Sequence, residues 1–326
     1  MSYNDLKDGI YIIHENKEWI LPYEKIFKTK NIELFEIDLS QKGSIDLDKK
    51  PPNGIFWNKM SASSHTRGNI YAKDYARIIL NWLDFYNKRI INPLNVLELE
   101  INKIAQYIAL QKANIKTPKT KIAFEKKDLL KLSENLTNPF IVKNNQGGKG
   151  IGVRLFKDYY ELYENIDNLD ISIDDIYILQ EYIKSKDNFI TRLEFIAGKF
   201  HYAIKVDISD ESFKLCPADT CELELKNIKL ASAACDIGAK FSLRTDINAN
   251  FSLVKDLENF LLNNNIEIAG IEFIDTGNEL IVYDINTNTN YNKNVENFVK
   301  QNQKIPAIDK VVEFLINEFK KIKDKL

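Results

Sequence analysis

Hydrophobic runs and polar gaps alternate regularly along the N-terminal part of the chain. Four short apolar segments predict buried β-strands, at residues 9–14, 32–37, 54–57 and 89–93. Helical spacing of apolar side chains predicts helices at 19–29 and 71–86, between and after these segments. Strands that alternate with helices predict a small α/β domain with a mostly parallel sheet.

The pattern changes after residue 93. A helix is expected at 97–113 and ends before Thr117-Pro118, because a residue that precedes proline disfavours helical backbone. Further strands are expected at 120–124, 140–143, 153–156, 176–183, 189–197, 200–208, 267–274 and 279–285. Further helices are expected at 126–135, 158–167, 227–240 and 252–263, and from residue 307 onward. The segment Ala197-Gly198-Lys199 predicts a hairpin, and Thr276-Gly277-Asn278 predicts a second tight turn.

Composition narrows the class of protein without naming a function. Of 326 residues, 44% are hydrophobic and 28% are charged, which is ordinary for a globular protein. Lys plus Arg is 45 and Asp plus Glu is 47, so the formal net charge of -2 gives no electrostatic footprint for nucleic acid. No stretch approaches the roughly 18 uninterrupted apolar residues of a membrane span.

The N-terminus and the cysteines predict a cytoplasmic location. The first residues lack the basic region and apolar core of a secretory signal. Cys216, Cys221 and Cys235 are odd in number and lack paired CxxC spacing, so we expect free thiols in a reducing compartment. The histidines are far apart in sequence, so a zinc site is not expected.

A glycine-rich segment, KNNQGGKGIG at residues 143–152, joins two predicted strands. Glycine lets backbone N–H groups approach an anion closely, which favours a phosphate-binding hairpin. The segment does not open into a helix, so it is neither a Rossmann nor a P-loop motif. Lys143 closes an apolar strand, where a buried ammonium needs an anionic partner such as a nucleotide phosphate. The alternatives are a turn that uses glycine for geometry alone and a lysine that reaches solvent.

Two further segments suggest contacts with ligands, one with a nucleotide and one with a substrate. The strand edge ILQEYI, residues 178–183, could pair its backbone with a heterocycle, and Asp187 beyond it could accept bonds from ribose hydroxyls. An ordinary strand is the alternative for this segment. The polar loop 58–69 follows a predicted strand, where open α/β sheets bind ligands. In it, Arg67 could pair with a substrate carboxylate and His65 could orient or deprotonate an amine; a plain helix-capping loop is the alternative.

Carboxylates and amides gather around the last strand pair. Glu272 lies in the strand AGIEF, and Asp284 and Asn286 end the following strand. Because a short turn joins the strands, they should pair antiparallel and bring Glu272 near Asp284. Two carboxylates raise one another's pKa unless a cation joins them, and hard oxygen ligands suit Mg²⁺. Asn288 and Asn290 continue the polar stretch as candidate substrate contacts; an asparagine-rich turn with an exposed acid is the alternative.

Taken in order, these motifs resemble the ATP-grasp ligases, in the branch of glutathione synthetase and the RimK-like α-L-glutamate ligases. The resemblance covers about residues 90–300, and residues 1–89 show only an α/β pattern consistent with it. It implies the ATP-grasp fold, of class α/β (α+β), with an N-terminal parallel-sheet domain. The implied divisions are an N-terminal α/β domain, a linker helix with the start of a small subdomain, a nucleotide-binding core and a C-terminal helix, at 1–93, 94–138, 139–305 and 306–326.

The resemblance also implies roles for individual residues. Lys143 would bind phosphates under a hairpin formed by Gly147, Gly148 and Gly150. The adenine hinge would be formed by Gln180, Glu181, Tyr182 and Ile183, and Asp187 would bind ribose. Arg192 and Lys205 would face phosphate or acyl phosphate, and Glu272, Asp284 and Asn286 would bind the metal. This sequence departs from the family at Ile190-Thr191-Arg192, where D-x-R is usual, at Asp284, where Glu is common, and in the long stretch 209–250.

The implied activity is an ATP- and Mg²⁺-dependent carboxylate–amine ligase that works through an acyl phosphate. Mn²⁺ is an alternative ion. The substrates would be small-molecule or peptide carboxylates and amines, with glutamate as the family-level choice. No nucleic-acid or membrane partner is expected, and a homo-oligomer is left open. Two alternatives stay open at this point: an ATP-binding sensor module without ligase activity, and a phosphotransferase that uses the same nucleotide site.

Overall fold

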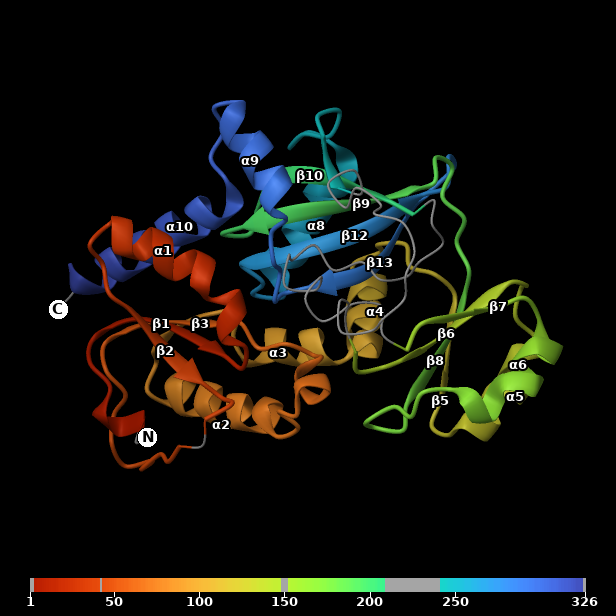
Figure 1. The fold of residues 1–326 in the computed structure, drawn as a ribbon, viewed down its shortest axis with the longest axis horizontal. Helices are drawn as coiled ribbons and strands as arrows, with labels where there is room; N and C mark the ends of the chain where they lie inside the picture. The colour runs from red at the N-terminus through yellow and green to blue at the C-terminus, as the bar shows by residue number, and fades with distance from the viewer. Residues whose placement is uncertain (1–2, 42, 148–151, 209–240, 325–326) are drawn as a thin grey trace, which may run out of the picture.

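The computed structural model describes residues 3–41, 43–147, 152–208 and 241–324, whose strands form three sheets (Figure 1). The first sheet is fully parallel with the order β2-β1-β3-β4. Its strands are β1 Gly9–His14, β2 Leu34–Asp38, β3 Gly54–Asn58 and β4 Arg89–Ile91. The predicted N-terminal parallel sheet is therefore confirmed.

Helices cover both faces of the first sheet. Residues of α1 (Leu21–Thr29) and α10 (Ala307–Lys323) share one hydrophobic cluster with one side of β1 and β3. Residues of α2 (Ala72–Phe85) form a second cluster with Tyr11 and Phe56, which point to the other side. Adjacent strand residues alternate between faces, so each central strand is apolar throughout.

The small sheet is antiparallel and has the order β5-β8-β6-β7. Its strands are β5 Thr120–Ala123, β6 Phe140–Asn144, β7 Arg154–Phe156 and β8 Tyr177–Glu181. The helices α5 (Lys126–Ser133) and α6 (Tyr159–Asn165) pack on it through a separate cluster that includes Leu129 and Leu162. β6 and β7 pair antiparallel, so the predicted hairpin around the glycine-rich segment is confirmed.

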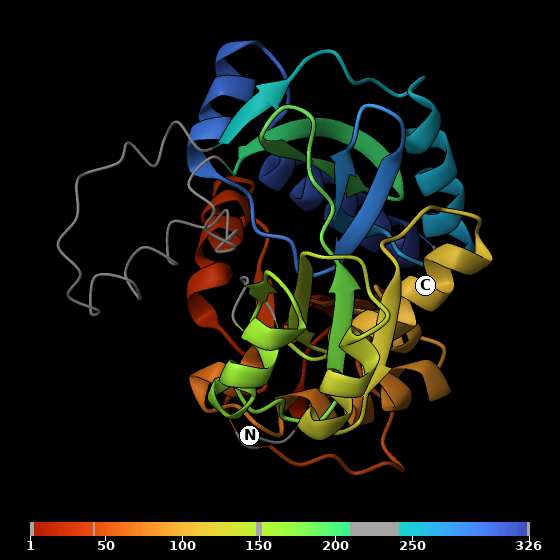
Figure 2. The same ribbon diagram turned by 90° about the vertical axis from the view of Figure 1, so that its right-hand side faces the viewer.

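The large sheet is also antiparallel, with the order β11-β10-β9-β12-β13, and it lies above the small sheet in Figure 2. Its strands are β9 Phe189–Ile196, β10 Lys199–Asp207, β11 Phe241–Arg244, β12 Ile268–Asp275 and β13 Leu280–Asn286. We call the face that carries Arg192 and Glu194 the inner face, and the face that carries Thr191 and Leu193 the outer face. The helices α4 (Lys103–Lys112) and α8 (Ser252–Asn263) cover the outer face, while α10 packs on part of the inner face.

One predicted helix is wrong, and one observed helix was missed. The expected helix at 97–113 is two helices, α3 (Leu94–Ile101) and α4, because Asn102 takes an extended conformation and its side chain accepts a bond from Ala105 N at 3.0 Å. An asparagine in this role caps a new helix. Asn292 caps the unpredicted helix α9 (Lys293–Gln301) in the same way. The expected helix at 227–240 and the cysteines lie outside the described residues.

Polar side chains join the first sheet to the large sheet. Asn92, in the left-handed region with φ 56°, donates to Ile268 O at 2.8 Å and Thr287 O at 3.2 Å. Its side-chain oxygen accepts from Glu267 N at 2.9 Å and Ile268 N at 3.2 Å. These bonds fix the start of β12 and the exit of β13 against β4, and so the N-terminal domain has a defined position next to the site described below.

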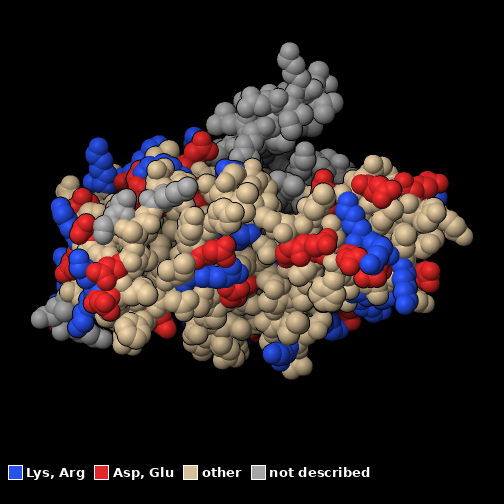
Figure 3. All heavy atoms as spheres, turned by 90° about the horizontal axis from the view of Figure 1, so that it is seen from below, with Lys and Arg blue, Asp and Glu red and all other residues tan. Residues whose placement is uncertain are grey.

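The surface and the helices add two observations. On the face drawn in Figure 3, basic and acidic side chains are intermingled, in agreement with the balanced composition. None of the described helices has the length and apolar character that crossing a membrane requires.

Candidate active site

The exit of β13 lies beside β12 as predicted. Glu272 is opposite Asp284 and Gly270 is opposite Asn286 in the strand register. The register shifts between Glu272 and Phe273, so Tyr283 is an extra residue in a β-bulge. Bulges re-aim side chains, and here Tyr283 Oη donates to Glu272 Oε2 at 2.5 Å. The bulge therefore adds a phenol to the two carboxylates.

Arg192 is buried at the centre of this cluster. It lies opposite Glu272 in the strand register. Its guanidinium donates to Glu194 Oε1 at 2.6 Å, Glu272 Oε1 at 2.9 Å and Thr289 Oγ1 at 2.6 Å. Burial alone would lower the pKa of Arg192, but the Glu194 and Glu272 carboxylates raise it above its ordinary value. The group therefore stays a cation, and it has further N–H donors beyond these three bonds.

The backbone of Gly270 makes room for this guanidinium. A Cβ atom at Gly270 would lie 2.1 Å from an Nη atom of Arg192 and 2.5 Å from its Cζ. Ordinary side chains never approach so closely. Glycine is thus required at this point of β12, since the arginine lies flat over the strand.

Lys143 reaches the cluster from the small sheet. Its side chain is buried, and Nζ donates to Tyr107 Oη at 2.6 Å and lies 5.2 Å from the centre of that ring. Tyr107 Oη in turn donates to Tyr283 O at 2.8 Å on β13. The predicted phosphate-binding lysine and the predicted metal ligands therefore converge, although they come from different sheets.

Lys103 is a functional candidate that the sequence analysis missed. It is the first residue of α4 and forms an ion pair with Asp284. Burial would raise the pKa of Asp284, but the ammonium of Lys103 outweighs it and holds that pKa below its ordinary value. Asn102 could have indicated this role from the sequence. An asparagine inside an apolar pattern can cap a new helix, and the start of α4 at Lys103 fixes the direction of the Lys103 side chain.

The oxygen atoms at this point fit a divalent cation. Asn286 Oδ1 is buried and has no hydrogen-bond partner among the described residues. Burial raises the pKa of Glu272, and Asp284 adds to the rise while Arg192 opposes it. No group of three or more His, Cys, Asp or Glu in the described ranges is placed to hold a metal. The candidate set is instead two carboxylates and one amide oxygen, which are hard ligands suited to Mg²⁺.

The hinge residues end β8 of the small sheet and begin the segment that leads to β9 of the large sheet. Gln180 is buried and donates to Thr120 Oγ1 at 2.8 Å, while the Glu181 side chain accepts from Lys119 N at 2.8 Å. Tyr182 N donates to Pro139 O at 3.3 Å. Within the part of the chain that the structure describes, the N–H of Ile183 has no acceptor, so it is available to a ligand.

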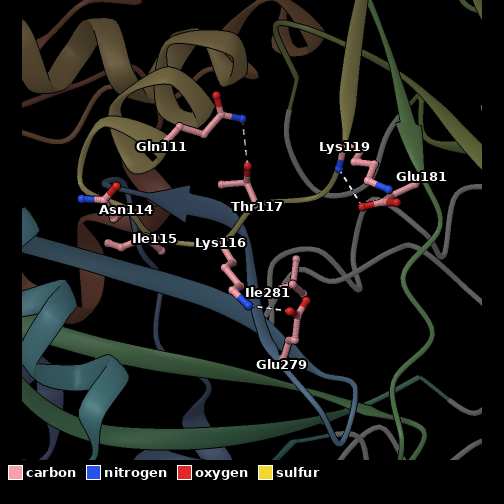
Figure 4. A pocket seen from close by; sticks show the side chains of 9 residues that line it. All are labelled: Gln111, Asn114, Ile115, Lys116, Thr117, Lys119, Glu181, Glu279 and Ile281. Atoms are coloured by element: carbon pink, nitrogen blue, oxygen red, sulfur yellow. Dashed lines mark hydrogen bonds and ion pairs between the residues drawn. The ribbon is translucent and has the colours of Figure 1, made fainter.

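A surface pocket of about 420 Å³ borders this hinge (Figure 4). Figure 4 shows the Lys119 backbone beside Glu181, and in the same lining Lys116 forms an ion pair with Glu279. The lining consists of Gln111, Asn114, Ile115, Lys116, Thr117, Lys119, Glu181, Glu279 and Ile281. The pocket therefore follows the linker between α4 and β5.

Other cofactor candidates sit at the margin or outside the described residues. Asp187 is exposed in the turn before β9. Gly147 is half-buried, three residues after the end of β6, whereas Gly148 and Gly150 lie outside the described residues. Asp187 and the three glycines keep their assigned roles as predictions.

Lys205 is not brought to the site. It lies opposite Thr191 on β10, so it belongs to the outer face, while Arg192 points to the inner face. Its Nζ is 4.6 Å from the centre of the Phe189 ring. The expectation that Lys205 faces the phosphates beside Arg192 is corrected, because a shift of one strand position changes the face.

The candidate substrate residues mostly have partners within the chain. Arg67 donates to both carboxylate oxygens of Glu15, at 3.1 Å and 2.5 Å, and stacks on Trp19. Asn288 and Asn290 accept bonds from Lys59, at 2.8 Å and 3.1 Å. These three side chains therefore have internal partners in this structure, and their substrate contacts stay predictions. Burial, with Lys73 nearby, lowers the pKa of the half-buried His65.

A family model and a curated relative each match part of the chain. Residues 101–214 match the family model described as the RimK-like ATP-grasp domain. A curated relative, coenzyme gamma-F420-2:alpha-L-glutamate ligase of Methanocaldococcus jannaschii, is 32% identical over 120 residues. These residues are 36% of this chain and 41% of that protein, so the match spans less than half of the relative.

Solved structures extend the likeness to the whole fold. A RimK domain protein of Sphaerobacter thermophilus aligns with a TM-score of 0.60 at 10% identity, covering 94% of this chain and 99% of that one. The ATP-grasp ligase PsnB, complexed with a minimal precursor, aligns with a TM-score of 0.64 at 10% identity, over 95% and 99%. D-alanyl-alanine synthetase A of Vibrio cholerae aligns with a TM-score of 0.62 at 11% identity, over 95% and 98%.

Proposed function

From the ATP-grasp fold and the RimK-like domain that this chain carries, we propose that it is an ATP-dependent carboxylate–amine ligase. One observation carries this proposal: the acids Glu272 and Asp284 and the orphaned Asn286 oxygen meet Lys143 of the small sheet through the Tyr107 link. Hard oxygen ligands and a cation from the opposite sheet are thus linked at one place. Such a site suits a nucleotide triphosphate with its metal.

The chain's own residues would act mainly by positioning and by neutralising charge. Lys143 and Lys103 would each hold phosphate oxygens, and Arg192 would keep a fixed positive charge where the phosphoryl group transfers. The N–H of Ile183 would donate to the adenine ring. Glu272, Asp284 and Asn286 would hold Mg²⁺, which supplies charge neutralisation to the phosphates when bound.

The reaction follows from the substrates. A carboxylate oxygen of the acceptor attacks the γ-phosphorus, the bond to the β-phosphate oxygen breaks, and ADP leaves. The acyl phosphate then meets an amine, whose nitrogen attacks the carbonyl carbon. The amide forms, phosphate leaves, and the amine gives up a proton. No enzyme nucleophile is needed for these steps.

The relatives favour an amino-acid or peptide substrate. The curated relative is named as a glutamate ligase, and PsnB is bound to a precursor. We therefore propose glutamate or another amino acid as the amine and a small-molecule or peptide carboxylate as the partner. Mg²⁺, with Mn²⁺ as an alternative ion, and a cytoplasmic location are part of the same proposal.

Turnover tests the proposal directly. Purified protein with ATP, Mg²⁺ and pooled amino acids and peptides should release ADP, and mass spectrometry should find a new amide. Asp284→Ala should abolish both products, whereas Asp256→Ala, at an exposed position of α8, should leave them unchanged.

Three outcomes would redirect the assignment. ATP binding without ADP release across the panel indicates a nucleotide-binding module. ADP release without a hydroxamate after addition of hydroxylamine indicates phosphoryl transfer to an acceptor that is not a carboxylate. Equal turnover by Asp284→Ala and the wild type refutes the metal-ligand set.

A further inference from the structure

The side chain of Lys59 crosses from the N-terminal domain into the loop after β13. Lys59 directly follows β3 and is 1% exposed. Its Nζ donates to Asn288 Oδ1 at 2.8 Å, Thr289 O at 2.8 Å and Asn290 Oδ1 at 3.1 Å. An ammonium group donates three hydrogen bonds, and all three go to consecutive residues of one segment. Lys59 therefore holds residues 288–290 in one arrangement.

The buried, aromatic surroundings of Lys59 are unfavourable for a charged side chain, so packing alone does not explain a lysine at this position. Three aromatic rings surround Nζ, those of Trp19, Tyr23 and Trp57, at 6.0, 5.8 and 5.6 Å. Among the described residues, no carboxylate pairs with it directly. Burial lowers the pKa of Lys59 to about 7, although Glu100 and Glu194 nearby oppose the shift.

A buried cation without a counter-ion lowers stability, and an apolar side chain of similar size would avoid that cost. Buried polar groups can be retained because they specify one arrangement of the chain. The three bonds of Lys59 are an arrangement of this kind, since they tie two side-chain oxygens and one backbone carbonyl of consecutive residues to one ammonium.

The segment that Lys59 holds also builds the candidate active site. Thr289 Oγ1 accepts a bond from Arg192 at 2.6 Å and donates to Glu194 at 3.0 Å. Asn286, three residues before Thr289, carries the orphaned oxygen. The site residues Asn286 and Thr289 thus lie in the same short segment, 286–290, as the residues that bind Lys59.

We propose that Lys59 is a positioning residue through which the N-terminal domain sets the geometry of Asn286 and Thr289 in the active site. The inference rests on the proposed function, because it concerns the metal and nucleotide site of that function. Lys59 touches neither metal nor nucleotide itself. Without its three bonds, Thr289 would lose its fixed position, and with it Arg192 and the approach of Asn286 to a metal.

Metal binding separates positioning from general stability. Mn²⁺ bound in the presence of a non-hydrolysable ATP analogue is counted by electron paramagnetic resonance in the full chain. Lys59→Met should remain folded and bind Mn²⁺ more weakly by about tenfold or more, as for residues that orient metal ligands. Its affinity for the analogue without metal should fall by a smaller factor, because Lys143 and Lys103 keep their positions. Lys88→Met is the control, because Lys88 bonds to Asn53 in the same domain, away from the site.

A second variant tests the positioning role of Lys59 if Lys59→Met does not fold. Asn290→Ala removes one of the three acceptors and leaves Lys59 in place, so we expect an intermediate loss of Mn²⁺ affinity. Wild-type Mn²⁺ affinity in the folded variants overturns the positioning role and leaves the proposed function standing. If the wild type itself binds no Mn²⁺ with the analogue, both proposals fail.

Discussion

Gly270→Ala is a sharp test of the site, because it leaves every candidate ligand in place. The added Cβ would lie 2.1 Å from an Nη atom of Arg192, whereas ordinary contact begins near 3.4 Å. The guanidinium must therefore move by about 1.3 Å, since the strand backbone is fixed between β9 and β13 by the sheet. The bonds to Glu272 and Thr289, now 2.9 and 2.6 Å long, would exceed hydrogen-bond length if the move is directed away from them.

The magnitude follows from the burial of these groups. A hydrogen bond to a charged group contributes about 1.5–3 kcal/mol, and breaking a buried ion pair costs about 3–5 kcal/mol. We expect Gly270→Ala to lower the free energy of unfolding by about 3 kcal/mol, between the loss of one bond and the loss of the whole pair. Urea unfolding followed by circular dichroism measures this, and ADP release should fall in the same protein.

Arg192→Ala supplies the control in a double-mutant cycle. If the clash with the guanidinium causes the loss, Gly270→Ala should cost less than about 1 kcal/mol in the Arg192→Ala background, because the space is then free. Equal costs in both backgrounds, or a Gly270→Ala protein as stable as the wild type, would refute the account of this contact.

Four other substitutions test separate parts of the structure. Asn286→Ala should leave the free energy of unfolding within about 0.5 kcal/mol of the wild type, because the lost oxygen has no bond, yet weaken Mn²⁺ binding by about tenfold or more; calorimetry would contradict this if both quantities fall together. Lys103→Ala should weaken binding of the ATP analogue, while Lys205→Ala on the outer face should leave it unchanged. If Lys205→Ala weakens binding more than Lys103→Ala in the same titration, the assignment of Lys205 to the outer face is wrong. The hydrogen bond from His14 lowers the pKa of Glu36 to about 2, below its unfolded value, so Glu36 adds stability above pH 4.5 that is lost as the pH falls towards 2. Glu36→Gln should remove about 2 kcal/mol of that pH-dependent stability, allowing for the partial exposure of the pair. Acid unfolding curves that are the same for the wild type and Glu36→Gln would exclude this contribution of Glu36.

The strand and helix pattern could be predicted because apolar periodicity reports which side chains are buried. The parallel N-terminal sheet, the glycine hairpin and the antiparallel pair that carries Glu272 and Asp284 all follow from local spacing and short turns. Short-range geometry is encoded within a few residues, so one sequence is enough to predict it.

The face of the sheet to which a side chain points, and contacts between distant residues, could not be predicted in the same way. The bulge at Tyr283 changes the alternation of side chains at one residue, and no composition rule marks it. Lys205 was assigned to the wrong face because the strand register decides between two faces that differ by one position. The Lys59 contacts join residues 229 to 231 positions apart, a separation that local patterns do not report.

The asparagines after β13 illustrate both points. Their density predicted oxygen ligands, and Asn286 keeps that role as a proposal. Asn288 and Asn290 instead bind Lys59, and Asn292 caps α9. Amide side chains serve as ligands, as acceptors for a buried cation and as helix caps with equal ease, so only their surroundings in the fold separate these roles.

Anomalous diffraction from a crystal grown with Mn²⁺ and a non-hydrolysable ATP analogue tests the central claim most directly. We expect an anomalous peak at roughly 2.0–2.1 Å from oxygens of Glu272, Asp284 and Asn286, the ordinary distance between Mg²⁺ and its oxygen ligands, with the triphosphate between that peak and Lys143. A peak bound only to other residues, or an analogue seated on the outer face of the large sheet, would contradict it.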